Sequence, residues 1–184
     1  MIGAITAGLF STGVAASTTA YESIATVTIG AGGATSATFS SIPSTYKHLQ
    51  IRGFARNSAA DYTISARFNS DSGSNYTIHQ LYGDGSTTGA YANASTAGGV
   101  PIGQTAFGTS IFGAFVCDIL DYANTNKYKT SRSLVGQDRN GAGQILLESG
   151  LWSNTAAISN IEVRINGTAL FEQYSSFALY GIKG

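Results

Sequence analysis

The chain contains two histidines, His48 and His79, and many serines and aspartates, which are the residue types of a hydrolytic triad. Both histidines lie in segments that alternate like strands. The sequence has no Gly-x-Ser-x-Gly motif, which would place a nucleophile on a strained turn. These observations favour structural histidines over catalytic ones.

Two carboxylates could serve polysaccharide hydrolysis, which requires a pair of acids at a set separation. Asp118 and Glu148 are the candidates, because both lie in apolar segments that could raise a carboxyl pKa. For Asp118 we favour a structural role, as the partner of a cross-strand arginine or hydroxyl. A salt bridge between subunits is the alternative. The sequence thus predicts no catalytic residue and no enzyme, although a polysaccharide-degrading enzyme stays open as a third hypothesis.

No metal or cofactor site is predicted. Asp118 and Asp121 are three apart on one strand-like segment and should point to opposite faces. Asp71 and Asp84 lie in turn-like sequence, where aspartate is common because it bonds its own backbone. Cys117 lies in an apolar run and should be a buried, inert thiol.

Aromatic and polar residues could form a binding surface in two segments. Residues 121–132 hold the only local cluster of basic and aromatic side chains, and a turn with solvated lysines is favoured there over a nucleic-acid or glycan surface. Residues 83–99 form a Gly/Ser/Thr/Ala-rich stretch that is predicted to be a long, interface-forming loop. The candidate surface residues are Tyr82, Asp84, Tyr91, Tyr122, Lys127 and Tyr128.

Composition limits the function classes. Charged residues make up 11% of the 184 residues, and ten acids balance ten bases, so no overall field favours nucleic acid or an anionic membrane. No segment is long and apolar enough to span a bilayer. With 43% hydrophobic residues the chain can bury one core, and its weakly charged surface favours association with neighbours.

The elements that must position these residues are strands, because alternation with period two recurs along the chain while helical periodicity is scarce. Short segments with turn residues between them predict about nine or ten strands in an antiparallel β-sandwich, with a jelly roll favoured. Residues 21–29 and 35–39 are expected to pair as a hairpin, and 110–122 to lie mid-core. Strand segments are also expected at 47–56, 62–68, 76–82, 128–136, 144–152, 158–165 and 177–182.

Two domains of unequal kind are expected. Residues 21–184 form the sandwich, and its C-terminal aromatic segment should be a strand of the sheet. Residues 1–20 carry no charge and are expected to form an extended arm. The arm would bind a partner by strand addition. The residues predicted to be buried there are Ile2, Ile5, Leu9 and Phe10.

Several segments resemble tailed-bacteriophage structural proteins, a family common in aquatic and cyanobacterial phages. The resemblance lies in the runs IPSTYKHLQIRG, FNSDSGSNY, DILDYANTNKYKT and YSSFALYGIKG, among others. It covers nearly the whole chain from Tyr21 onward.

This resemblance implies a virion component, either a capsid decoration (cement) protein or a tail-fibre appendage. For the first we expect a homo-oligomer, with a trimer favoured, that binds the major capsid protein through its arm and its β-domain. For the second we expect a domain that recognises host-surface glycans. Neither form implies a cofactor, nucleic acid or membrane.

Overall fold

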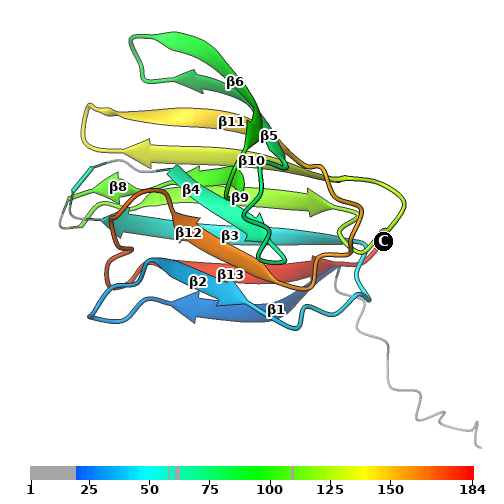
Figure 1. Ribbon diagram of the computed structural model, residues 1–184. Coiled ribbons are helices and arrows are strands. Elements are labelled where there is room, and N and C mark those ends of the chain that lie inside the picture. Colours follow the sequence, from blue (N-terminus) through cyan, green and yellow to red (C-terminus); the bar gives the residue numbers. More distant parts are fainter. Residues whose placement is uncertain (1–19, 58, 61–62, 109) are drawn as a thin grey trace, which may run out of the picture.

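The computed structural model of the protein describes residues 20–57, 59–60, 63–108 and 110–184. Thirteen strands and no helix lie in this part of the chain (Figure 1). The larger sheet has the order β1 (Tyr21–Thr28), β13 (Ser176–Ile182), β3 (His48–Asn57), β9 (Gly113–Leu120), β10 (Lys129–Asp138), β11 (Gly143–Trp152), β5 (Tyr76–Gly83) and β6 (Thr88–Thr96). The short β8 (Ala106–Phe107) pairs with β3 and completes nine strands. The smaller sheet has the order β2 (Ser36–Phe39), β12 (Ile161–Ile165), β4 (Thr63–Phe68) and β7 (Val100–Gln104).

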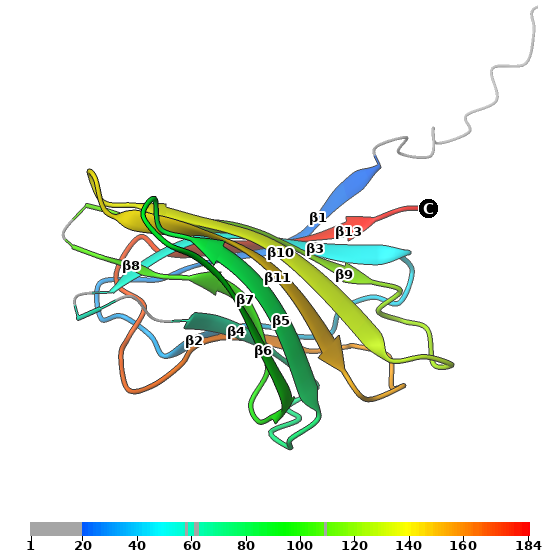
Figure 2. The ribbon, with the colours of Figure 1, turned by 90° about the horizontal axis from the view of Figure 1, so that it is seen from above.

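The predicted all-β, antiparallel sandwich is confirmed. Every strand pair is antiparallel except β3 with β8. The larger sheet is strongly curved, and its β5–β6 end bends toward the side where the smaller sheet lies (Figure 2). The jelly roll is an eight-stranded topology, and for this arrangement of nine and four strands it stays a prediction.

The core lies between the two sheets. In β9 the side chains alternate between buried and accessible, so that Phe115, Cys117 and Ile119 point inward. They meet residues of the smaller sheet such as Ile64 and Val163, which are fully buried. Since β9 lies between β3 and β10 in the larger sheet, the prediction that this segment lies mid-core is confirmed.

Two glycines make room for one aromatic ring in this core. A Cβ atom on Gly53 of β3 would lie 2.7 Å from the ring of Phe115 and 2.8 Å from Phe177. A Cβ atom on Gly103 of β7 would lie 2.5 Å from the same Phe115 ring. The sheets can therefore approach one another here only because these positions carry no side chain.

Two predictions about the elements were wrong. Residues 21–29 and 35–39 do not pair, since β1 pairs with β13 and β2 pairs with β12 in the other sheet. The glycine turn between them carries the chain from one sheet to the other. Residues 83–99 are not one long loop, because β6 pairs with β5 along its length.

The C-terminal aromatic segment is confirmed as a strand, β13, which lies between β1 and β3. The predicted arm, with Ile2, Ile5, Leu9 and Phe10, falls outside the described residues except for Ala20. Among the residues that the structure describes, no helix is long and apolar enough to cross a membrane.

Candidate interaction surface

The side of the larger sheet that faces away from the smaller sheet is called the outer face. Strand register aligns its side chains in rows that cross the strands. One row contains Leu134 of β10, Leu147 of β11 and Leu81 of β5, which are direct cross-strand neighbours. The next row lies two residues further along the strands and contains Ile145 of β11 and Phe54 of β3.

These five side chains are large, apolar and about half exposed: the exposed fractions are Phe54 47%, Leu81 58%, Leu134 51%, Ile145 58% and Leu147 55%. We call them the apolar patch. A single exposed leucine is ordinary, but large apolar side chains that are direct neighbours, as Leu134, Leu147 and Leu81 are here, are typical of an interface.

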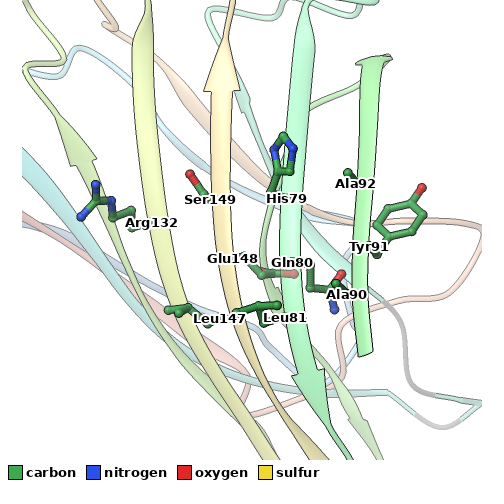
Figure 3. A pocket seen from close by; sticks show the side chains of 10 residues that line it. All are labelled: His79, Gln80, Leu81, Ala90, Tyr91, Ala92, Arg132, Leu147, Glu148 and Ser149. Atoms are coloured by element: carbon green, nitrogen blue, oxygen red, sulfur yellow. The ribbon is translucent and has the colours of Figure 1, made fainter. Parts of the chain in front are cut away.

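Polar side chains border the apolar patch on one side. Arg132, Ser149 and His79 form the adjacent row on β10, β11 and β5. Figure 3 shows these three in a line beside Leu147 and Leu81, which lie side by side. Together they line a shallow groove of about 670 Å³ with Ala90 and Ala92 of β6. An apolar floor with a polar rim is the usual anatomy of a protein-binding surface.

The same polar row continues across β9 and β3 as a chain of hydrogen bonds. The Arg52 Nε donates to Gln50 Oε1 over 2.6 Å, and Gln50 Nε2 donates to Asp118 Oδ1 over 2.7 Å. The Arg52 guanidinium also lies 5.5 Å from the ring centre of Tyr21 and 5.3 Å from that of Tyr180. We expected an arginine or a hydroxyl as the partner of Asp118, but the hydrogen bond comes from the side-chain amide of Gln50. Arg132 is the direct neighbour of Asp118 on β10.

The two histidines do not share a site. His79 is exposed on β5 at the rim of the groove. The Nδ1 atom of His48 accepts a hydrogen bond from the backbone N–H of Asp121 at 2.9 Å, so this histidine holds the end of β9. Three strands lie between β3 and β5 in the sheet order, and the four strand spacings amount to about 19 Å.

The two acids considered for hydrolysis lie on opposite faces of the larger sheet. Asp118 pairs in register with Arg132 on the outer face, whereas Glu148 pairs with Ser133 and Gln80 on the inner face. They cannot flank one substrate from these positions.

Glu148 is the buried acid of the inner face. Only 6% of it is exposed, and its Oε2 atom has no hydrogen-bond partner among the described residues. Burial raises the pKa of Glu148 to about 7, because a carboxylate loses hydration there. Burial also raises the pKa of the Cys117 thiol to about 12, so the prediction of an inert cysteine is confirmed.

Asp71 and Asp84 have the backbone roles expected of turn residues. Asp71 accepts a hydrogen bond from the backbone N–H of Gly73 at 2.9 Å. It also accepts from Trp152 Nε1 at 2.8 Å and from the Asn75 side chain, and the Trp152 bond is the main cause of its lowered pKa. Asp84 accepts from the backbone N–H of Thr87 at 2.6 Å and of Ser86, which lowers its pKa. Among the described residues no three His, Cys, Asp or Glu side chains gather as metal ligands.

The six candidate surface residues do not form one surface. Tyr82, Asp84 and Tyr91 belong to the β5–β6 hairpin, while Tyr122, Lys127 and Tyr128 lie between β9 and β10. Register places these two groups at opposite ends of the larger sheet, since Gly83 aligns with Gly136 through Ile145, and Tyr76 aligns with Lys129 through Trp152.

Their exposure also differs. Tyr122 was wrongly predicted to be a surface residue: it is fully buried, its hydroxyl donates to the Pro43 carbonyl, and burial raises its pKa. Tyr82 is half-buried, with its ring against Gly89. Tyr91 and Tyr128 are exposed by 48% and 52%, and Lys127 is exposed and paired with Asp121.

The expectation of solvated lysines in this turn was wrong for Lys129. Its side chain is 1% exposed. Its Nζ atom donates to the carbonyls of Asn124 at 2.6 Å, Lys127 at 2.9 Å and Thr155 at 2.9 Å, and thus joins two loops. Burial lowers its pKa. Sequence spacing held a signal for this, because strand alternation places residue 129 on the same face as the buried Ser131 and Ser133.

The apolar patch was missed from the sequence, because Leu81, Leu134 and Leu147 look like core residues until the strand register is known.

No family model, curated protein or solved structure matches the chain.

Proposed function

We propose that the protein is a structural subunit that binds neighbouring protein subunits through the apolar patch of its outer face. The observation that carries this proposal is the register of Leu134, Leu147 and Leu81, three half-exposed leucines side by side on three adjacent strands. Burying such side chains in an interface contributes about 1 kcal/mol or more each, before the cost of association.

The resemblance to tailed-bacteriophage structural proteins gives this role a setting. In that setting the subunit is a capsid decoration protein that self-associates, as a trimer in the form we favour, and binds the major capsid protein on the virion. The weakly charged surface supports the proposal, since little charge has to be desolvated when such a surface is covered.

The proposal is tested by replacing one leucine of the apolar patch. Sedimentation equilibrium of the wild-type protein over a range of concentrations should give a discrete oligomer. Leu147→Asp should shift the protein to the monomer and weaken the affinity of self-association at least tenfold, because a carboxylate would be buried in the interface.

The control is Leu170→Asp, which changes the same residue type at similar exposure (44%) in the segment before β13, away from the outer face. It should leave the oligomer unchanged. A wild-type protein that stays monomeric at millimolar concentration, or equal effects of both substitutions, would contradict the role of the apolar patch.

A further inference from the structure

A second, polar cavity lies on the inner side of the β5–β6 end of the larger sheet. It has a volume of about 380 Å³ and is bounded by β11, β5 and β6 on one side and by β4 and β7 of the smaller sheet on the other. In Figure 2, β5 and β6 curve away from the rest of the larger sheet toward the level of β4. We call it the Glu148 cleft.

The side chains that line the Glu148 cleft are mainly hydroxyls, amides and one carboxyl group. Glu148 and Gln80, which line the cleft, are cross-strand neighbours and lie beside one another in Figure 3. Ser65 and Thr63 of β4 and Asn166 after β12 supply further oxygen and nitrogen atoms. The volume falls within the range of small-molecule sites, about 300–1,000 Å³.

Glu148 gives the cleft its chemical character. It is more than nine-tenths buried, and its Oε2 atom lacks a hydrogen-bond partner among the described residues although the side chain lines a cavity. A buried polar group of this kind costs stability unless something bonds to it, so a ligand in the cleft that bonds to Oε2 would remove this cost.

Tyr91 adds an aromatic surface to the mouth of the cleft. It lies on β6 directly opposite Gln80, lines the cleft and remains 48% exposed. Its hydroxyl accepts a hydrogen bond from Asn93 Nδ2 at 3.1 Å, which helps to fix the ring. An exposed aromatic ring beside hydrogen-bonding groups offers both a flat apolar face and polar partners.

We propose that the Glu148 cleft binds one neutral sugar ring of a glycan, with Glu148 and Gln80 bonded to its hydroxyls and Tyr91 against its C–H face. A sugar hydroxyl both donates and accepts, which matches a protonated carboxyl group and an amide. A metal ion fits less well, since Glu148 is the only carboxylate among the described residues that line the cleft. A small organic cation is the competing ligand, and it would require the ionised carboxylate.

The test uses saturation-transfer NMR and titration at pH 6 with four probes: the methyl glycosides of glucose, galactose, mannose and N-acetylglucosamine. Methylammonium serves as the cation probe. At least one glycoside should bind the wild-type protein. Tyr91→Ala should weaken that binding at least tenfold, and Glu148→Leu should abolish it because the leucine cannot form hydrogen bonds.

Glu148→Gln separates the two kinds of ligand. It keeps a donor and an acceptor, so glycoside binding should stay within about threefold of the wild type, while any cation binding should be lost. Tyr128→Ala is the control, since Tyr128 is equally exposed but does not line the cleft. Thermal unfolding checks that each variant is folded. If Glu148→Leu does not fold, the test depends on Tyr91→Ala, which changes an exposed side chain.

The proposal is overturned if none of the four glycosides binds the wild type. It is also overturned if glycoside binding survives in both Tyr91→Ala and Glu148→Leu, or if Glu148→Gln abolishes the glycoside binding.

Discussion

Glu148 and Lys129 are ionisable side chains that strand pairing carries into the interior, and they are accommodated differently. The ammonium group of Lys129 donates hydrogen bonds to three backbone carbonyls, so its charge is solvated by the protein. Glu148 keeps one oxygen without a partner in the described part of the chain, and its raised pKa is the result.

The raised pKa of Glu148 predicts a specific dependence of stability on pH. Its pKa is about 7 in the folded state and near its ordinary value of 4.5 in the unfolded state. Between these values the folded state binds more protons, so the free energy of unfolding should fall as pH rises from about 4.5 to 7. The full effect is about 3 kcal/mol, present below pH 4.5 and lost above pH 7.

Denaturant unfolding of the wild type and of Glu148→Gln across this pH range measures the effect. The variant should lack this component, so the difference between the two proteins should change with pH. Among the described residues, the other ionisable side chains on the inner face of β9, β10, β11, β5 and β6 are Cys117, Lys129, Tyr76, Tyr82 and Tyr91. None of them is a carboxyl or imidazole group, which are the groups that ordinarily titrate in this window. Parallel curves for the two proteins would contradict the prediction.

At the residue level the sequence predicted the inert Cys117 and the turn roles of Asp71 and Asp84, because these depend on local surroundings. It could not predict the burial of Tyr122 or the opposite faces of Asp118 and Glu148. Those depend on which strands pair and in which register, and a shift of one residue would exchange the two faces.

At the level of elements, strands with clear alternation could be predicted to within a few residues. The strand β6 could not, because both of its faces are accessible and its sequence of small residues has no apolar side to reveal it. The strand β7 contains Pro101, which suits the edge of a sheet but is unusual within a strand. The sequence could not show that residues 21–39 are divided between two sheets, because the same glycine-rich turn can connect either a hairpin or two strands of different sheets.

The close packing of β3 against Phe115 and Phe177 leads to a prediction about Gly53. Gly53→Ala should lower the free energy of unfolding by about 1–3 kcal/mol, because the added methyl group would overlap both rings. Gly136→Ala is the matched control, since no atom lies within 4 Å of a Cβ placed on that glycine of β10. Denaturant unfolding should show a change of at most about 0.5 kcal/mol for the control, and equal effects of the two substitutions would rule out this packing argument.

At the level of the whole molecule, two routes to assembly are open: the apolar patch and the arm of residues 1–20 expected from the sequence. The fold class followed from patterning alone, because alternation and turn residues recur along the chain. The patch is a property of the assembled sheet and required the strand order.

Deletion of residues 1–19 distinguishes the two routes. The shortened protein should unfold at nearly the wild-type temperature, because all the described strands lie from Tyr21 onward. If the apolar patch drives association, sedimentation should still detect the oligomer. A folded but monomeric deletion variant would assign assembly to residues 1–19 instead.

The pairing of β1 with β13 brings the beginning and the end of the sandwich to one corner. The backbone N–H of Lys183 donates to the carbonyl of Ala20 at 3.1 Å, so the beginning and the end of the described sandwich are hydrogen-bonded neighbours. In a protein shortened to residues 20–184, a short linker could therefore close the backbone into a ring, and cutting the exposed turn at Ser86 would give a circular permutant with the same sheets. Anything fused to either end of that shortened protein would likewise emerge from this corner and leave the groove and the cleft accessible.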